Sequence, residues 1–376
     1  MTTYDAADIR NWSGTGYYIA KSLMEQSLSV EFIGPLSEYR SLLFKAKQFA
    51  YLMLTKKRYR REREPSILKA YSQQVSERLE NTDADIVFSP GTIPISYLEC
   101  RQPIVFWTDS TFAGLLDFYP EFSDLSEESV QNGNLMEQSA LSRSKLAIYS
   151  SPWAAKSAVD NYQVENSKVA VVPYGANVAD DRTIEDIRRL VDSRPSGSCR
   201  LLFVGVDWRR KGGDTAFRVA RELNDRGLKT QLTVVGCKPL LRKPLPSFLR
   251  VFEFIDKSTP AGRKWLNKLI AESHFLALPT KADCTPIVLN EANSFGVPCL
   301  ASDVGGVPSI IKDDANGRVF AEAAEIPEYC DYVLDLMSDR SRYRQIAISS
   351  FNEYQARLNW SVAGKTVKKL LDKHCA

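Results

Sequence analysis

Short apolar runs alternate with amphipathic stretches along most of the chain. Residues 275–278 and 103–107, for example, are almost wholly apolar and stop at a proline or a polar residue, which is typical of buried parallel strands. The stretches between such runs repeat their apolar residues at helical spacing. This regular alternation predicts an α/β protein built on parallel sheets.

The expected elements fall into two series, separated by a linker-like segment at 192–198. Strands are predicted at 29–33, 85–89, 103–107, 145–149 and 169–172, and then at 200–206, 231–236, 251–255, 275–278, 298–301 and 318–320. Helices are predicted at 17–26, within 36–80, at 127–143 and 180–191, and then at 214–226, 261–273, 286–295, 326–355 and 362–373. Residues 2–4 resemble the tail of a missing first strand, and we therefore hypothesise that Met1 is not the natural start or that this strand is truncated.

The composition is that of an ordinary globular chain with room for two domains. The 376 residues are 44% apolar and 25% charged, and the net charge of +3 gives no reason to expect nucleic acid as a partner. No apolar stretch is long enough to predict a spanning helix, and the first ten residues do not resemble a signal peptide. Seven scattered cysteines and two histidines argue against zinc and predict reduced thiols in the cytoplasm.

The stretch 275–309 is predicted to form a βαβ unit with two acids near the carboxyl edge of the sheet, where doubly wound folds bind ligands. Thr285 is expected to cap the helix and Pro286 to begin it, with Asp283 before the helix and Glu291 two turns inside. Free amides at the helix start suit a diphosphate, and the carboxylates suit hydroxyl groups. The alternative is an acid that complements the helix dipole and a solvated glutamate.

A second candidate is the turn 207–213, which follows the strand at 200–206 and precedes a helix. Its basic residues Arg209, Arg210 and Lys211 stand beside two glycines, a combination that suits a diphosphate. The alternative is an ordinary basic surface turn.

The first half carries weaker candidates. A glycine turn with Gly14 and Gly16 opens a helix, and glycines let the backbone approach a phosphate or a sugar. Asp109 follows the strand at 103–107, at a typical ligand position. Glycine turns before helices are common, however, and Asp109 also fits the role of a helix cap.

Residues 45–63 are expected to form very basic helices with apolar and aromatic residues in between. This pattern favours a surface that contacts anionic lipid or an anionic acceptor. A solvated helix face is the alternative, because Glu62 and Glu64 reduce the charge.

The segment from Asp283 to Gly306 resembles the Glu-x7-Glu signature of the retaining family-4 glycosyltransferases. Asp283 and Glu291 stand at its two acidic positions, with seven residues between them, and further matches are Ala292, Gly296, Pro298, Gly305 and Gly306. Those enzymes have the GT-B fold, two Rossmann-like doubly wound domains that face each other across a cleft. The resemblance implies an N-terminal acceptor domain at 1–177, a nucleotide-sugar domain at 178–355 and a C-terminal helix at 356–376 that returns to the first domain.

The resemblance implies roles for the acidic pair and the residues between them. Glu291 is expected to hold the nucleotide ribose, and Asp283 the hydroxyls of the donor sugar. Backbone amides near the diphosphate and sugar are expected from Cys284, Thr285 and Ile287. The sequence departs from the family in having Asp at the first acidic position, one methylene shorter than Glu, and in Pro286, which has no N–H.

The resemblance also implies the groups that neutralise the leaving diphosphate. Lys211 matches a family lysine that grips the donor phosphates. A family arginine just after the strand is replaced here by Val206, so Arg210 is expected to take its place, with Arg209 as the alternative.

Further donor contacts are implied at both ends of the proposed site. The loop with Gly14 and Gly16 is expected to face the donor, and Phe254 and Ile255 to cup the nucleobase. Asp109 stands near a position where the family often has a histidine that approaches the donor sugar.

The implied function is transfer of a sugar from a nucleotide-sugar, with a UDP-sugar favoured, to a glycan, lipid-linked or small-molecule acceptor, as in polysaccharide biosynthesis. The anomeric configuration is expected to be retained without a protein nucleophile, a metal or a cofactor. A cytoplasmic location is expected, with peripheral contact of residues 45–63 with the inner face of an anionic membrane. The alternatives are a nucleotide-sugar epimerase, against which the scarcity of histidine argues, and a non-catalytic nucleotide-sugar binding protein.

Overall fold

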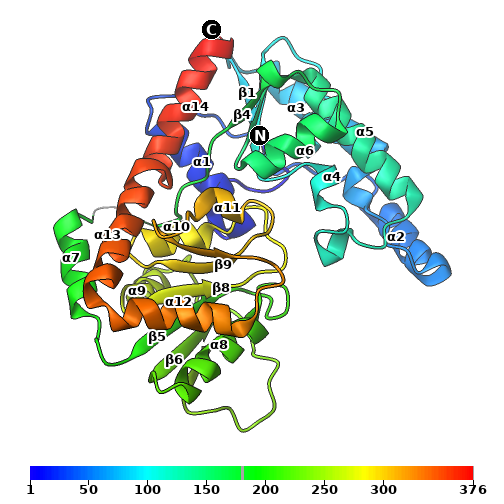
Figure 1. Cartoon of the computed structure of the whole chain (residues 1–376). Coiled ribbons are helices and arrows are strands. Elements are labelled where there is room, and N and C mark those ends of the chain that lie inside the picture. The colour runs from blue at the N-terminus through cyan, green and yellow to red at the C-terminus, as the bar shows by residue number, and fades with distance from the viewer. Residues whose placement is uncertain (179–181, 376) are drawn as a thin grey trace. The chain divides into compact units, whose positions relative to one another are not determined.

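The computed structural model describes residues 1–178 and 182–375. The chain divides into two compact units. Unit 1 is Met1–Pro173 with Ala363–Ala376, and unit 2 is Tyr174–Val362. The colours of Figure 1 follow the residue number, so each unit can be found by its colours. The sequence predicted that the first domain ends at 177 and the second at 355. The last helix, α14 (Trp360–Cys375), therefore starts in unit 2 and continues in unit 1.

Unit 2 is built on a six-stranded parallel sheet in the order β10-β9-β8-β5-β6-β7. Its strands are β5 (Cys199–Val204), β6 (Thr230–Val235), β7 (Leu249–Phe252), β8 (Phe275–Leu278), β9 (Cys299–Ser302) and β10 (Gly317–Phe320). The chain starts at β5, moves outward through β6 and β7, and then returns to the other side of β5 with β8. This reversal between β5 and β8 is the switch point at which doubly wound sheets bind ligands.

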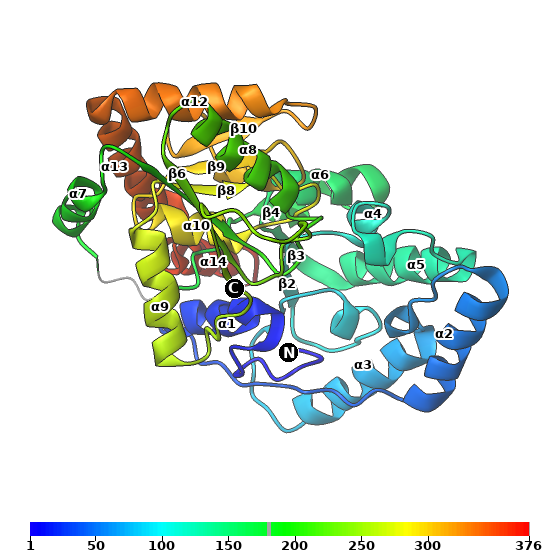
Figure 2. The same ribbon diagram turned by 90° about the horizontal axis from the view of Figure 1, so that it is seen from below.

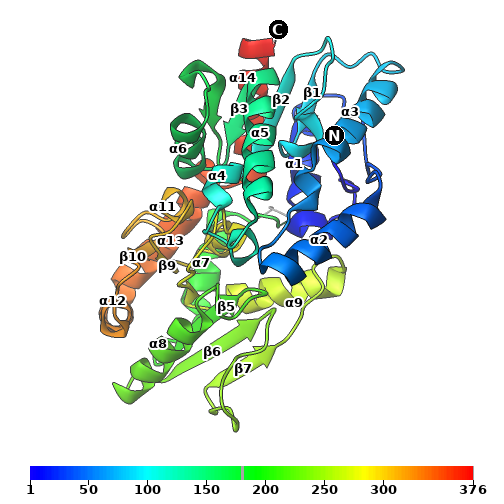
Figure 3. The same cartoon turned by 90° about the vertical axis from the view of Figure 1, so that its right-hand side faces the viewer.

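Helices cover both faces of that sheet. They are α7 (Ile184–Ser193), α8 (Gly213–Asp225), α9 (Pro260–Ala271), α10 (Ile287–Asn293), α11 (Val307–Ile310), α12 (Ile326–Ser338) and α13 (Arg340–Arg357). Figures 2 and 3 show α8 and α9 on opposite sides of the sheet, and α12 packs against α8. With helices on both faces, the central strand β8 is wholly buried, which explains its unbroken apolar sequence.

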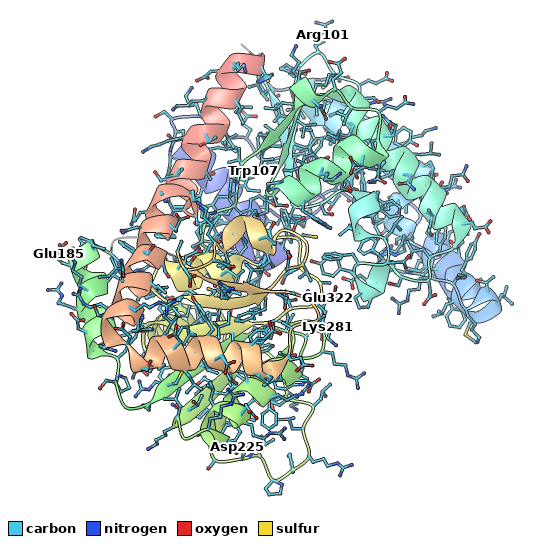
Figure 4. The ribbon with its side chains drawn as sticks, in the orientation of Figure 1. Arg101, Trp107, Glu185, Asp225, Lys281 and Glu322 are labelled. Carbon is cyan, nitrogen blue, oxygen red and sulfur yellow. The ribbon has the colours of Figure 1, made fainter. Side chains whose placement is uncertain are left out.

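Unit 1 contains a four-stranded parallel sheet in chain order, β1-β2-β3-β4. Its strands are β1 (Val87–Ser89), β2 (Ile104–Thr108), β3 (Ser144–Tyr149) and β4 (Val169–Val171). Its helices are α1 (Thr15–Met24), α2 (Ser41–Thr55), α3 (Pro65–Leu79), α4 (Phe112–Leu115), α5 (Glu127–Arg143) and α6 (Pro152–Asn161). Trp107 of β2, labelled in Figure 4, is fully buried, and its indole N–H donates to the carbonyl of Val172 at 3.0 Å.

The strand predicted at 29–33 is wrong. The segment belongs to no sheet, although the Thr2 amide donates to the Ile33 carbonyl at 2.9 Å. Its alternating sequence fits a strand, but a strand also needs a continuous ladder with a neighbour, and no periodicity can supply one.

Two helix predictions also need correction. The basic stretch 45–63 is not helical throughout, because α2 ends at Thr55 and Lys56 adopts a left-handed conformation (φ 60°). Helix α7 begins at Ile184 under a capping box of Thr183 and Asp186, while the predicted start at 180 lies outside the described residues.

The segment 192–198, predicted as a linker, is anchored inside unit 2. Arg194 is buried, and its guanidinium donates to the carbonyls of Gly296 (2.7 Å), Phe295 (2.8 Å) and Ala271 (3.1 Å). These bonds tie the end of α7 to the turn after α10.

The turn that follows β5 passes very close to the end of β8. Gly212 adopts φ +80°, and a Cβ at this position would overlap the carbonyl oxygen of Pro279. Gly213 faces the indole of Trp208 in the same way. The two glycines therefore allow the loops after β5 and β8 to touch.

We predict that Gly212→Ala destabilises the protein markedly more than Gly227→Ala. Both glycines have positive φ, so each alanine suffers a left-handed strain of about 1–2 kcal/mol, but no atom lies within 4 Å of the Cβ position at Gly227. Only Gly212→Ala must also move backbone. Melting temperatures of the two variants measure the difference, and equal losses would contradict the close approach of the two loops.

Candidate functional site

The loops that follow β5, β8 and β9 meet at the carboxyl edge of the unit 2 sheet. Lys211, after β5, forms an ion pair with Asp283, after β8, through its Nζ and the carboxylate Oδ2. The two side chains are only 14% and 8% exposed. The amide of Gly306, after β9, donates to the Asp283 carbonyl at 3.2 Å. The structure thus places a lysine and an aspartate side by side at the switch point.

Buried packing and a hydrogen bond of Trp208 stabilise the loop that carries Lys211. Trp208 is buried and donates from Nε1 to the Asp214 carboxylate at 2.8 Å, and its ring packs under Gly213. The stem of Lys211 lies over Gly205, where a Cβ would come within 2.8 Å of the lysine Cγ. The packing therefore restricts the rotamers of the Lys211 side chain and fixes the position of its ammonium group.

Arg210 stabilises the contact between the same two loops. Its guanidinium donates to the Ala282 carbonyl at 2.8 Å, and its own carbonyl accepts from the Lys281 amide at 2.7 Å. Arg210 thus bonds to the residue before Asp283, and part of its hydrogen-bonding capacity serves the protein backbone.

Glu291 lies almost fully buried on α10, with a side chain that is 2% exposed. Its Oε1 accepts from the ammonium of Lys257 at 2.5 Å. Lys257 belongs to the loop after β7, so two distant segments meet at the second acidic position. A buried glutamate paired with a lysine replaces the solvated helix glutamate that the sequence had left as the alternative.

The start of α10 differs from the prediction. The helix spans Ile287–Asn293, the N-cap position is Pro286, and no side chain caps it. Thr285 instead donates from its hydroxyl to the Cys284 carbonyl at 2.7 Å. The prediction of Thr285 as the cap is wrong because Pro286, with ψ of 93°, is still extended and delays the helix by one residue.

The candidates Phe254, Ile255 and Arg209 lie in loops that follow strands of unit 2. Strand β7 ends at Phe252, so Phe254 and Ile255 belong to the loop beyond it rather than to the predicted strand 251–255. Phe254 is 75% exposed, and Arg209 is also exposed. Figure 4 shows the charged residues Lys281 and Glu322 near each other on one side of unit 2.

The candidates Gly14, Gly16 and Asp109 belong to unit 1. Gly14 is left-handed (φ 87°), and it follows two further residues with positive φ, Trp12 and Ser13. Gly16 has a packing role, because a Cβ there would come within 2.6 Å of the Tyr4 hydroxyl. Asp109 lies directly after β2. Burial raises the pKa of Tyr4, and the negative charge of Asp109 raises it further.

The sequence did not identify two charged residues of note, Lys257, which pairs with Glu291, and Glu137, which is buried. Lys257 could have been found, because it follows a parallel strand of the same sheet as Lys211. Glu137 could not, since it lies in the middle of α5 in a polar, helical sequence that gives no sign of burial. Burial raises its pKa to about 7, against the opposing effects of hydrogen bonds from the Thr92 side chain and the Phe112 backbone and of the charge of Arg63.

His274 has a structural role at the start of β8. Its Nδ1 accepts from the Arg200 amide at 3.0 Å, and its Nε2 lies 2.9 Å from the Pro195 carbonyl. Burial lowers the pKa of this imidazole to about 4. Within the described ranges we find no group of three or more His, Cys, Asp or Glu residues that could hold a metal ion, and no helix long and apolar enough to cross a membrane.

Comparison with known proteins connects unit 2 to one family. Residues 189–351 match the family described as "Glycosyl transferases group 1". The D-inositol 3-phosphate glycosyltransferase of Nocardia farcinica is 25% identical over 232 residues, which are 59% of this chain and 50% of that protein. The chain covers between 50% and 64% of the length of the first curated relatives that it matches.

Solved structures resemble both units. Sucrose-phosphate synthase from Thermosynechococcus elongatus matches with a TM-score of 0.61 at 17% identity, over 82% of this chain and 78% of that chain. The Anabaena protein Alr3699/HepE, solved in complex with UDP-glucose, matches with a TM-score of 0.57 at 14% identity, over 80% of this chain and 82% of that chain. These likenesses show the fold, and the predicted α/β architecture of the GT-B class is confirmed.

We predict that Glu137→Gln stabilises the protein at pH 8 and changes little at pH 4.5. The folded pKa of about 7 lies above the ordinary value of 4.5, so the folded state binds the proton more tightly and loses stability as the pH rises from about 4.5 to 7. The variant, which does not titrate, escapes a loss of at most about 3 kcal/mol.

The measurement is the difference in melting temperature between variant and wild type across this pH range. Glu127→Gln, an exposed position on the same helix, is the matched control and should show no such trend. A difference that does not depend on pH would contradict the buried, titrating carboxyl.

Proposed function

We propose that this protein is a glycosyltransferase that binds a nucleotide-sugar at the switch point of unit 2. The observation that carries the proposal is the Lys211–Asp283 pair, formed between the loops after β5 and β8. The match of residues 189–351 to group 1 glycosyl transferases supports the same reaction class.

In this proposal the donor diphosphate replaces the Asp283 carboxylate as the ion-pair partner of Lys211. Lys211 and Arg210 then neutralise the charge that develops on the leaving diphosphate, and a fixed donor of this kind typically contributes on the order of 3 kcal/mol. Asp283, released from the lysine, accepts hydrogen bonds from the sugar hydroxyls. Glu291, held in place by Lys257 at 2.5 Å, receives the ribose hydroxyls.

Further contacts with the donor are proposed from the resemblance to the family alone. Backbone groups of Cys284, Thr285 and Ile287 lie next to Asp283 in sequence, and their amides are proposed to approach the sugar and diphosphate. Phe254 and Ile255 are proposed to contact the base, which is consistent with their place in the loop before Lys257. In unit 1, the loop of Gly14 and Gly16 and the carboxylate of Asp109 are proposed to serve the same reaction, and Arg209 is held as a second basic group for the diphosphate.

The finer chemistry follows the resemblance of the acidic pair to the retaining family-4 enzymes. We propose a UDP-sugar donor, because a structural neighbour was solved with UDP-glucose. Transfer is proposed to retain the anomeric configuration and to need no metal cofactor, with basic side chains carrying the diphosphate charge. The seven cysteines are free thiols, which is consistent with a cytoplasmic location.

The proposed acceptor is a glycan, a lipid-linked molecule or a small molecule, and the surface of α2 favours contact with an anionic membrane. Leu42, Phe49 and Met53 share one face of α2 and are 79%, 66% and 54% exposed. Figure 2 shows α2 at the edge of unit 1, beside the start of α5. Lys45, Lys56 and Lys57 flank this apolar face, as in helices that lie in the membrane interface.

We predict that UDP-sugars raise the melting temperature of the wild type and that Glu291→Ala abolishes most of the shift. A ligand that binds only the folded state stabilises it by roughly 2.7 kcal/mol at a hundred times its Kd. Lys211→Ala should lower turnover by about a hundredfold, since it removes a charge that acts on the leaving group. Lys229→Ala, an exposed lysine at the start of β6, is the matched control.

The assay screens UDP-, GDP- and ADP-sugars with the free nucleotides beside them, and NMR follows the anomer formed. A shift without transfer to any acceptor would favour a binding protein, and an epimerised donor would favour an epimerase. Unchanged kinetics in both Glu291→Ala and Lys211→Ala would remove the assignment of the site.

We predict that replacing Leu42, Phe49 and Met53 with serine lowers binding to anionic vesicles at least about tenfold. Each of these side chains contributes on the order of 1 kcal/mol when it enters a bilayer even in part. Co-sedimentation with phosphatidylglycerol-containing and pure phosphatidylcholine vesicles measures the effect, and Leu135→Ser, an exposed leucine of α5, is the control. A dimer that the triple variant dissociates, without vesicle binding, would show that a second copy covers α2 instead.

A further inference from the structure

A cavity of about 850 Å³ lies at the amino edge of the unit 1 sheet, where the parallel strands begin. Its walls include Ile104, the first residue of β2, Ser144, the first residue of β3, and Lys168, which directly precedes β4. The last turn of α14 contributes His374 and Cys375. The volume falls within the usual range of small-molecule pockets, about 300–1,000 Å³.

This cavity lies at the edge of the sheet opposite to the carboxyl ends of the strands. Doubly wound sheets bind their substrates at the carboxyl ends, and the candidate Asp109 follows the end of β2 there. The wall residues are 98–104, 142–145, 168 and 374–375, and all of them belong to unit 1. The cavity is therefore a feature of unit 1 alone, and it lies apart from the candidate residues already described in that unit.

Positive charge gathers at this cavity. Its walls carry four permanently basic side chains, those of Arg101, Arg143, Lys145 and Lys168, and a single acid, Glu99. Arg143 lies 3.8 Å from the Glu99 carboxylate, whose side chain is 88% exposed, and an exposed pair at that distance contributes little. Within the described ranges the other three basic side chains have no carboxylate within ion-pair distance. Most of the positive charge is therefore unbalanced.

The fold holds two of these basic residues in place. Lys145 is the one exposed residue of the otherwise buried strand β3. Burial raises the pKa of the Cys375 thiol and the charge of Lys145 opposes this effect, so the lysine lies near the end of α14. Arg143 ends α5, and its guanidinium bonds to described residues through Nη1 alone, at 2.6 Å from the Ser139 hydroxyl. Since a guanidinium has five N–H donors, most of them stay available to a ligand.

The charge of the cavity favours a ligand with more than one negative group. A phosphate monoester carries a charge of about −1.5 to −2 at pH 7, so two phosphates balance four basic side chains. Guanidinium groups bind phosphate through paired N–H donors, and ammonium groups bind it as point charges. A neutral molecule or a single carboxylate would leave most of the positive charge without a partner.

We propose that this cavity binds a small soluble molecule with two phosphate groups, such as a sugar bisphosphate, through its two arginines and two lysines. The end of α14 and the loop before β2 lie together at the end of unit 1 away from α2 (Figures 1 and 3), and Figure 4 shows Arg101 there. The helix proposed to contact the membrane is thus remote from the cavity, which favours a soluble ligand over a lipid headgroup. The inference does not rest on the proposed transfer reaction.

The test is isothermal titration calorimetry on the full chain at a salt concentration of about 0.15 M, which screens exposed charges beyond about 8 Å. The probes are fructose 1,6-bisphosphate, 2,3-bisphosphoglycerate and inorganic pyrophosphate. Fructose 6-phosphate has one phosphate, citrate has only carboxylates, and both serve as comparisons. We expect one equivalent of at least one probe to bind, with both comparison compounds at least about tenfold weaker.

Single lysine variants then locate the site. Lys145→Ala and Lys168→Ala should each weaken the probe about tenfold, because each removes a charged hydrogen bond to a phosphate. Lys365→Ala, which removes an exposed lysine of α14 outside the cavity, is the matched control and should leave the affinity unchanged. Lys211→Ala tests whether the probe binds at the unit 2 site instead. Melting curves show that each variant is folded.

Two thiols of the cavity report on its occupancy. Cys100 and Cys375 line it and are partly exposed, whereas the other five cysteines are buried. N-ethylmaleimide, which is uncharged, should label these two first, since thiol reactivity requires access. A saturating probe should slow the labelling of both at least about fivefold, because it covers them. Mass spectrometry of the peptides measures the two rates.

The proposal is overturned if no probe binds, if citrate binds as tightly, if only Lys211→Ala weakens binding, or if the bound probe leaves both thiols equally reactive. It is also overturned if no soluble probe binds and Lys145→Ala instead weakens binding to vesicles that contain phosphatidylinositol 4,5-bisphosphate, since the ligand is then a lipid headgroup. Donor binding and turnover are measured without these probes, so the proposed transfer reaction can fail or hold separately.

Discussion

The ion pair between Lys211 and Asp283 is the interaction on which the candidate site depends. It joins loops from two strands that are neighbours in the sheet but about seventy residues apart in the chain, and both side chains are nearly buried. Removing either partner of such a pair leaves an uncompensated buried charge, which typically costs about 3–5 kcal/mol. The pair is therefore stable only when each charge has a partner, either the other residue or a ligand that replaces it.

The rest of unit 2 fixes the geometry of this pair. Gly212 lets the turn after β5 approach Pro279, and Arg210 bonds to the backbone of the neighbouring loop at Ala282. Farther away, Arg194 binds the carbonyls that end α10, the helix that carries Glu291. Hydrogen bonds from the guanidinium groups of Arg210 and Arg194 to backbone carbonyls thus help to hold the segments that carry both acidic positions.

Unit 1 shows the opposite use of buried polar groups. In unit 2 Lys211 pairs with Asp283 and Lys257 with Glu291, whereas one carboxylate oxygen of Glu137 and the hydroxyl of Tyr4 in unit 1 have no hydrogen-bond partner among the described residues. Such unsatisfied buried groups reduce stability, because burial removes their hydrogen bonds to water.

The sequence alone determined the α/β class and most strands, because buried parallel strands are short, apolar and separated by periodic helices. It also identified Lys211, Asp283 and Glu291 as candidates, since each lies on or near the segment that follows a strand. It failed where the outcome depends on a distant partner. The strand expected at 29–33 pairs with no neighbouring strand in the described residues, and the ion pair of Glu291 with Lys257 joins a helix and a loop that no local pattern connects.

The burial of Glu137 was likewise decided only by the tertiary structure. In sequence this residue is one polar position in a polar helix, and helix propensity is the same on either face. Only the packing of α5 against the sheet turned that position inward, and burial then raised its pKa to about 7. Local patterns determine which elements form, but the surroundings of a side chain depend on which elements pack against it.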